Sequence, residues 1–170
     1  MAITTLEEKF TFELNSIYDA EHQFLEAQQT MLESANSETV RQMLEKHIAE
    51  TEQQIVNLSR VHEILGLTAK RETCAAAEGL VTEGNTILSE TEDVPSLADL
   101  AIAGSNSKVE HFEIAAYGTA RSHALQLNNT DAADLLQQTL EEESQTDERL
   151  SRLAENRIND QADPNHIQGS

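Results

Sequence analysis

Two acidic residues, Glu110 and Glu113, stand in the middle of an uncharged helical pattern that begins near residue 96. They are three positions apart, so they share one face of a helix. The other positions on that face carry no charge and are Ala103, Ser107, Ile114 and Tyr117. This face is expected to be buried, and burying an unpaired carboxylate costs more than the net stability of a domain. A positive partner is therefore required, and because basic residues are scarce, a metal cation is the first candidate.

The charge balance excludes several functions. The chain has 31 acidic and 11 basic residues, giving a formal net charge of −20. Such a surface repels phosphate backbones and anionic membranes, so we expect neither nucleic-acid nor membrane binding. No apolar run approaches the ~18 residues of a membrane span, and the N-terminus lacks the pattern of a signal peptide. With a single cysteine, Cys74, expected to be inert, these features predict a cytoplasmic protein.

Apolar residues at helical spacing, with only 6 glycines and 2 prolines, favour long helices. Four are predicted, over residues 5–34, 38–65, 96–127 and 130–156. The breaks between the first and second helices and between the third and fourth are short. Two antiparallel hairpins therefore form.

The two hairpins are joined by a long crossover. Residues 67–89 are expected to connect them and to contain a short helix, weakened by Gly79 and Gly84. An acidic loop at 90–95 closes the crossover. The predicted fold is all-α, a four-helix bundle over residues 1–158 with a short fifth helix in the crossover. A flexible tail is expected at 159–170.

The first two helices also carry polar residues on their apolar stripes. Glu21 lies on the stripe of the first helix, and Glu13, on its edge, is the alternative. In the second helix His47 and Glu50 are three apart at mid-length, where a purely structural helix would have leucine. Counting outward from the turn near residue 35 places Glu21 opposite residues around 49, close to Glu50.

The last helix has an acid at the matching level. Counting from the turn near residue 129 places Glu110 and Glu113 opposite residues 145–148. Glu143 and Asp147 bracket that level, and the count alone does not choose between them.

Four helices with a carboxylate on or beside the stripe at mid-length are typical of a carboxylate-bridged dinuclear metal site. Glutamate can bridge two ions or chelate one, and an imidazole suits iron or zinc, while an oxygen-rich set keeps manganese possible. The alternative is that acids fall on the stripes by chance in so acidic a chain. In that case His47 is a hydrogen-bonded core histidine. Its order before Glu50 reverses the Glu-x-x-His of many bundle sites.

Three other side chains near these positions receive structural interpretations. Tyr18 and Tyr117 are expected to be core residues that hydrogen-bond a carboxylate, with electron transfer as the alternative role. His111 points to a different side of its helix from Glu110, so a supporting or structural role is predicted for it.

Several strings resemble the YciE/YciF-like family, a bacterial stress-associated branch of the ferritin-like superfamily related to rubrerythrin. They lie at residues 17–23, 47–55, 78–80, 108–118 and 140–143. The resemblance covers about residues 5–156 and implies a ferritin-like bundle, a homodimer and a site for two divalent ions, iron first, with manganese or zinc possible. The implied ligands are Glu21, His47, Glu50, Glu110, Glu113 and Glu143.

The sequence departs from the superfamily at Thr146, where many relatives have the histidine of Glu-x-x-His, and similarly at Gln53. The cysteine pairs of rubredoxin are absent too, so rubrerythrin's electron route is not expected. The resemblance implies a stress protein that acts on peroxide or dioxygen or handles iron, as a di-metal oxidoreductase if it is an enzyme. The alternative is a non-catalytic interaction module with a structural or vestigial metal site.

Overall fold

Five helices make up the structure, a computed structural model that describes residues 2–153. They are α1 (Leu6–Ser34), α2 (Glu38–Ile64), α3 (Ala75–Thr91), α4 (Pro95–Gln126) and α5 (Thr130–Leu153). The all-α prediction is confirmed, and the four long helices begin and end close to the predicted residues. The end of the last predicted helix and the tail lie outside the described residues. Over the described part of the chain, no helix is long and apolar enough to cross a membrane.

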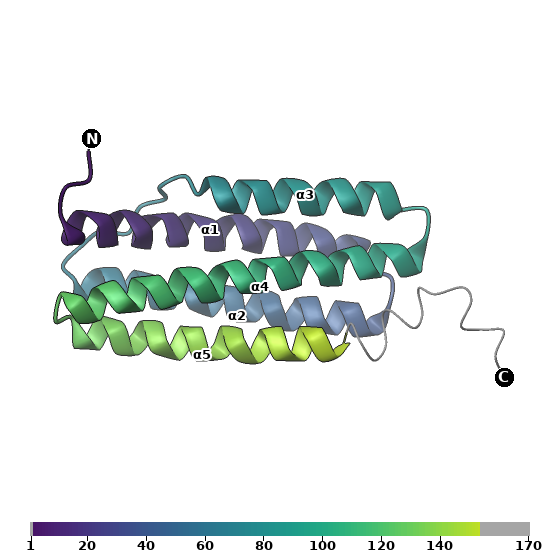
Figure 1. Cartoon of the computed structure of the whole chain (residues 1–170). Coiled ribbons are helices and arrows are strands. Elements are labelled where there is room, and N and C mark those ends of the chain that lie inside the picture. The colour runs from purple at the N-terminus through teal and green to yellow at the C-terminus, as the bar shows by residue number, and fades with distance from the viewer. Residues whose placement is uncertain (1, 154–170) are drawn as a thin grey trace.

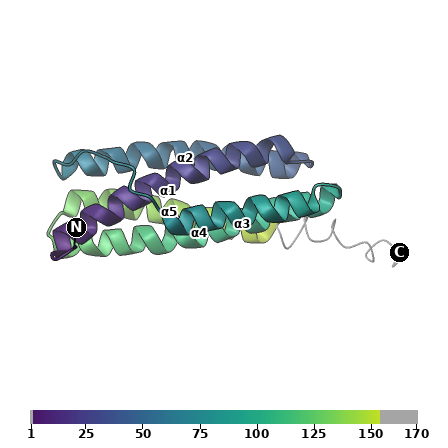
Figure 2. The same ribbon diagram turned by 90° about the horizontal axis from the view of Figure 1, so that it is seen from above.

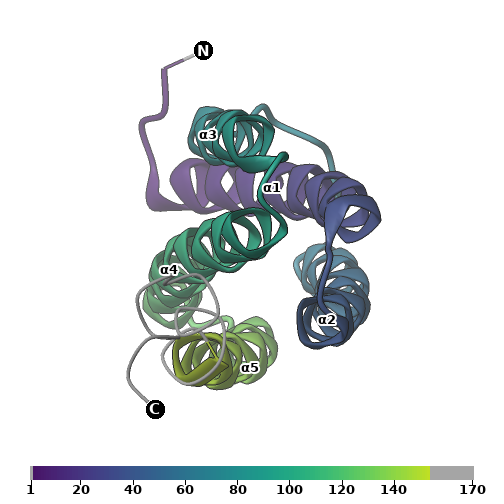
Figure 3. The same ribbon diagram turned by 90° about the vertical axis from the view of Figure 1, so that its right-hand side faces the viewer.

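The four long helices run side by side as two antiparallel hairpins, α1–α2 and α4–α5 (Figure 1). Viewed end-on, they occupy the corners of the bundle, and α3 lies outside it against α1 and α4 (Figure 3). The view from above shows α3 following the direction of the bundle (Figure 2). The helix α3 is longer than predicted, at 17 residues. The acidic loop is correspondingly shorter, because α4 already begins at Pro95.

Helix α1 begins with a capping box. The Thr5 hydroxyl accepts a hydrogen bond from the Glu8 N–H at 3.1 Å, and the Glu8 carboxylate accepts one from the Thr5 N–H at 3.2 Å. These bonds satisfy backbone donors that have no partner inside the helix. Where α2 ends and the crossover begins, Gly66 has a φ of +68°, a backbone conformation that favours glycine.

Two aspartate side chains fix connecting segments onto the bundle helices. Asp99 of α4 accepts hydrogen bonds from the backbone N–H groups of Asn36 and Ser37, both at 2.8 Å, and so ties the α1–α2 turn to the start of α4. Asp19 of α1 accepts from the Cys74 N–H at 2.9 Å and from Arg71 Nε at 2.8 Å, which holds the crossover on α1. Asp99 therefore joins the two hairpins, and Asp19 joins the crossover to the first of them.

The apolar core is divided along the bundle. One cluster lies toward the start of α1, with Leu14 and Leu136 at its centre, and a second lies toward its end, with Leu44 and Ile102. A third, smaller cluster packs α3 against α1. Between the first two clusters, each bundle helix contributes buried polar side chains at mid-length. This polar layer is where the sequence predicts the metal site.

Candidate metal centre

Four buried carboxyl groups meet in the polar layer. Glu21 comes from α1, Glu110 and Glu113 from α4, and Glu143 from α5, and each is at most 1% exposed. Each glutamate continues the apolar stripe of its helix, so the same periodicity that buries leucine elsewhere buries an acid here. The structure thus brings four of the predicted ligands together, from three helices.

The fourth helix supplies an imidazole, and one carboxylate is shared between two groups. Ligand atoms of His47, Glu110 and Glu113 lie within 4.8 Å of one another, and so do those of Glu21, Glu113 and Glu143. Two ligands of one ion are at most about 4.2 Å apart when each lies about 2.1 Å from it, so small side-chain adjustments suffice. The two triads have Glu113 in common.

Glu50, the sixth predicted ligand, lies at the rim of this cluster and outside both triads. Its side chain is 24% exposed and accepts a hydrogen bond from Arg149 at 2.8 Å. It also accepts one from the Thr146 hydroxyl at 3.2 Å, and Lys46 is 3.5 Å away. Within the layer, one turn further along α2, the buried amide of Gln54 donates to Glu143.

The two alternative acids lie outside the cluster. Glu13 is paired with Lys9 and, at 2.6 Å, with His123. Asp147 is 24% exposed and lies 3.3 Å from His111, which is itself at the surface. Of the pairs that the sequence left open, the structure therefore places Glu21 and Glu143 inside the bundle.

Hydrogen bonds fix the tautomer of His47. The Asn106 side-chain NH₂ donates to the Ile102 carbonyl at 2.9 Å, which turns the amide oxygen toward His47 Nδ1, also at 2.9 Å. A carbonyl oxygen only accepts, so Nδ1 carries the hydrogen. Burial lowers the pKa of His47, so the ring is neutral at pH 7. The Nε2 lone pair is therefore left facing the carboxyl groups, the form in which histidine binds metals.

That lone pair meets an acid at short range. His47 Nε2 and Glu110 Oε1 are 2.7 Å apart, and no aligned hydrogen bond joins them. Two lone pairs this close repel each other unless a proton or a metal ion lies between them. Both oxygens of Glu113 and one oxygen of Glu21 are also buried without a hydrogen-bond partner.

In the metal-free protein, protons compensate the crowded carboxylates. Burial, followed by repulsion from Glu143, raises the pKa of Glu21 to about 8. Burial also raises the pKa of Glu110 to about 8 and that of Glu143 to about 10, with repulsion between these two acids contributing to the latter. The pKa of Glu113 is raised well above its usual range, first by burial and then by the charge of Glu143. The cluster thus holds several protons at neutral pH.

One tyrosine is part of the cluster. The Tyr117 hydroxyl, from α4, donates to Glu21 Oε1 at 2.5 Å, as the expected carboxylate contact requires. The Tyr18 ring packs edge-on against His22 and His62. Asn106 was not among the predicted site residues, whereas Gln54 continues the polar interruption that His47 and Glu50 begin on the second helix. Asn106 is four residues before Glu110 and so shares its helix face, which was a usable signal.

The donor set fits a divalent transition metal. Carboxylate oxygens and one neutral imidazole nitrogen suit iron, manganese or zinc, and they are a poor match for copper. The buried oxygens without partners are the atoms that such ions would bind.

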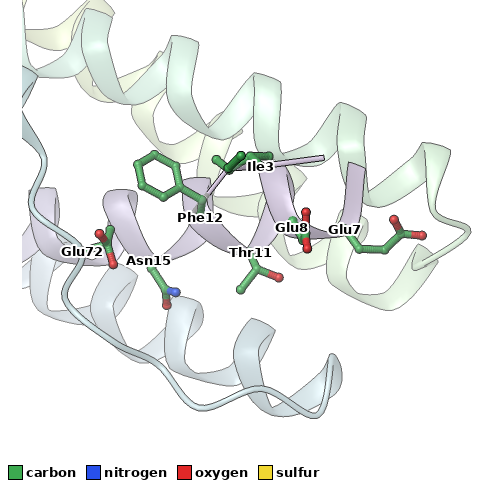
Figure 4. A pocket seen from close by; sticks show the side chains of 8 residues that line it. Ile3, Glu7, Glu8, Thr11, Phe12, Asn15 and Glu72 are labelled. Carbon is green, nitrogen blue, oxygen red and sulfur yellow. The ribbon is translucent and has the colours of Figure 1, made fainter. Parts of the chain in front are cut away.

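A separate cavity of about 690 Å³ lies near the start of α1. It is lined by Ile3, Glu8, Phe12 and Glu72 among others and contains none of the predicted ligands (Figure 4).

Fold and site together define an all-α bundle protein with a buried carboxylate–histidine cluster that could hold metal. The chain belongs to the family described as "Domain of unknown function (DUF892)", whose profile matches residues 5–163. The predicted YciE/YciF-like membership is confirmed. The protein YciF of Escherichia coli (strain K12) is 38% identical over 164 residues, covering 96% of this chain and 98% of that protein.

Two solved structures resemble the fold closely. The crystal structure of the E. coli stress protein YciF has a TM-score of 0.86 at 38% identity, covering 92% of this chain and 99% of that one. YcfI of Rhodopseudomonas palustris, described as a proposed structural protein, has a TM-score of 0.82 at 34% identity, covering 88% of this chain and 94% of that one.

Proposed function

We propose that this protein binds two divalent metal ions, iron or manganese, in the polar layer and acts on peroxide or dioxygen during bacterial stress. The observation that carries the proposal is the sharing of Glu113 between two triads of buried ligand groups. One shared carboxylate between two ligand sets is what a dinuclear site requires. The description of the E. coli relative as a stress protein supports the physiological setting. A homodimer in the cytoplasm is part of the proposal.

The proposal takes its ligands from the two triads. His47 and Glu110 would hold one ion, Glu21 and Glu143 the other, and Glu113 would bridge them. When bound, two adjacent ions of variable oxidation state supply the electron pair that reduction of an O–O bond consumes. Glu50 lies close enough for its charge to raise the pKa of Glu110, and we keep it as a candidate ligand at the rim.

The surrounding residues position the ligands. Asn106 accepts the Nδ1 hydrogen of His47, so Nε2 faces inward. Gln54 and Tyr117 donate to Glu143 and Glu21, respectively. The raised pKa values of Glu21 and Glu143 belong to the metal-free protein, so metal binding at these carboxyl groups would release their protons.

The direct test is peroxide consumption by metal-loaded protein. Chelator-stripped protein is reconstituted anaerobically with ferrous or manganous ions, and loss of hydrogen peroxide is followed in the presence of a chemical reductant. We expect consumption that scales with bound metal and disappears in Glu113→Gln. The matched control is Glu141→Gln, an exposed glutamate on α5 that lies outside the cluster. Background consumption by the loaded parent protein would contradict the proposed chemistry.

A second candidate function is structural. The relative described as a proposed structural protein favours a module in which metal only stabilises the bundle. Such a site would raise the melting temperature on metal binding and leave peroxide and dioxygen consumption at background. Measuring both quantities on one preparation distinguishes the two functions.

A further inference from the structure

A cavity of about 280 Å³ lies between α2 and α5, on the outer side of the carboxylate cluster. These helices are neighbours in the end-on view (Figure 3). Its lining includes Lys46, His47 and Glu50 from α2 and Thr146 and Arg149 from α5. His47 is buried and belongs to the candidate metal centre, whereas the side chains of Lys46 and Arg149 are 54% and 45% exposed. The cavity therefore has the cluster on one side and solvent-exposed cations on the other.

The charge of this cavity differs from that of the protein. In a chain with a formal net charge of −20, the lining carries two cations, Lys46 and Arg149, against one carboxylate, Glu50. Arg149 uses one nitrogen, Nη2, for both Glu50 and Thr146, and Lys46 Nζ lies 3.5 Å from Glu50. A guanidinium has five N–H donors and an ammonium three, so a single carboxylate leaves most of them available.

We propose that this cavity binds a small oxyanion, a carboxylate or a phosphate, on Arg149 and Lys46. The planar guanidinium matches the two oxygens of either group, and the ammonium adds a second charge. An anion seated there lies against His47 and Glu50, next to the ligand cluster. We assign this anion the role of a co-substrate of the metal centre, and that role rests on the proposed function. Binding of the anion to Arg149 and Lys46 does not rest on it.

The test uses the metal-free full-length chain, so that failure of the proposed metal chemistry does not affect it. Uniformly ¹⁵N-labelled protein is titrated with sodium phosphate and, separately, with sodium acetate, with sodium chloride holding the ionic strength constant. We expect saturable amide shifts confined to the residues around positions 46, 146 and 149. Saturation with both probes indicates a general oxyanion site, and saturation with one identifies phosphate or carboxylate as the preferred group.

Two pairs of variants locate the site. Arg149→Gln is expected to weaken anion binding about 10- to 100-fold, the loss of one charge-assisted contact, while Arg60→Gln, elsewhere on α2, leaves it unchanged. Lys46→Gln is expected to weaken it less, and Lys108→Gln is its control, since Lys46 and Lys108 are 54% and 53% exposed. Absence of saturable shifts with both probes, or equal binding by Arg149→Gln and the parent, would overturn the inference.

Discussion

Tyr117 of α4 donates its hydroxyl hydrogen to Glu21 Oε1 of α1 at 2.5 Å, and both side chains are fully enclosed in the bundle. This bond joins the two hairpins within the polar layer. It stabilises the ionised form of Glu21 and so opposes the effect of burial on that carboxyl group.

Removing this donor should make Glu21 a poorer metal ligand. In Tyr117→Phe the pKa of Glu21 rises further above about 8, so a metal ion must displace a more tightly held proton. We expect about a 10-fold loss of affinity for manganous ion at pH 7, a typical effect for a group that supports a ligand. Isothermal titration calorimetry measures it. The control is Tyr18→Phe, which changes the other tyrosine of the chain, and equal affinities in the two variants would remove Tyr117 from the site.

The tautomer of His47 depends on Asn106. Asn106→Leu removes the acceptor of the Nδ1 hydrogen, so Nε2 no longer presents a fixed lone pair. We expect a loss of metal affinity of about 10- to 100-fold. Asn106→Asp keeps an acceptor and should retain more affinity than the leucine variant. Thr51→Val controls for the removal of a buried polar group as such, because the Thr51 hydroxyl donates to Gln28 and to the His47 carbonyl rather than to the carboxyl groups.

Neutralising Glu110 should stabilise the metal-free protein at high pH. Glu110 has a pKa of about 8 in the folded protein against a usual value of 4.5, so between about pH 5 and 8 the folded parent keeps a proton that the unfolded chain has lost. The parent therefore loses stability through this group as pH rises, whereas glutamine does not titrate. We expect the stability of Glu110→Gln relative to the parent to rise by about 1.4 kcal/mol per pH unit between about pH 5 and 8, while dinuclear metal binding is lost. Chemical denaturation at about pH 5 and about pH 8 with chelator present measures the first effect. A stability difference that does not change with pH would show that Glu110 is solvated.

The cluster also sets the sign of the pH dependence. Glu21 and Glu143 have a raised pKa in the folded protein, about 8 and about 10, against a usual value of 4.5. The folded state therefore binds more protons than the unfolded state above about pH 4.5, and stability falls as pH rises toward the folded pKa. Each such carboxyl contributes a slope of about −1.4 kcal/mol per pH unit between about pH 5 and 8.

Surface repulsion in this acidic chain acts in the same direction, so the slope is tested by difference. Urea unfolding gives the unfolding free energy of metal-free Glu143→Gln between about pH 5 and 8. This free energy should fall with pH less steeply than in the parent, by about 1.4 kcal/mol per pH unit, because the pKa of Glu143 in the parent lies above this window. Glu141→Gln, an exposed neighbour, should reproduce the parent slope. Parallel curves for all three proteins would mean that Glu143 is ionised inside the bundle.

The fold could be predicted from the sequence because the residues that begin and end each helix lie next to its boundary. Thr5 closes a capping box, and Gly66 and Asn128 take the positive φ values that end α2 and α4. The length of α3 was underestimated for a tertiary reason. Gly84 lowers helix propensity, yet it is buried where an added Cβ would come within 3.0 Å of Met31 Cε, so packing requires the residue that propensity disfavours.

The candidate site was predictable where a single helix determines it. Glu21, Glu110, Glu113 and Glu143 continue apolar stripes, and the structure buries all four. Glu50 also shares a face with His47, but its position depends on Arg149 of α5, a long side chain whose reach no stripe reveals. Distinguishing Glu143 from Asp147 likewise required the α4–α5 packing, which leaves Asp147 beside His111.

Metal content measured in parallel on the parent and on Glu113→Gln tests the central claim most directly. Both proteins are stripped with chelator, reconstituted anaerobically with excess ferrous ion, desalted and analysed by inductively coupled plasma spectrometry. Because Glu113 belongs to both triads, we predict about two ions per chain in the parent and at most about one in the variant. A parent protein that retains no metal, or a variant that retains as much as the parent, would contradict a dinuclear centre bridged by Glu113.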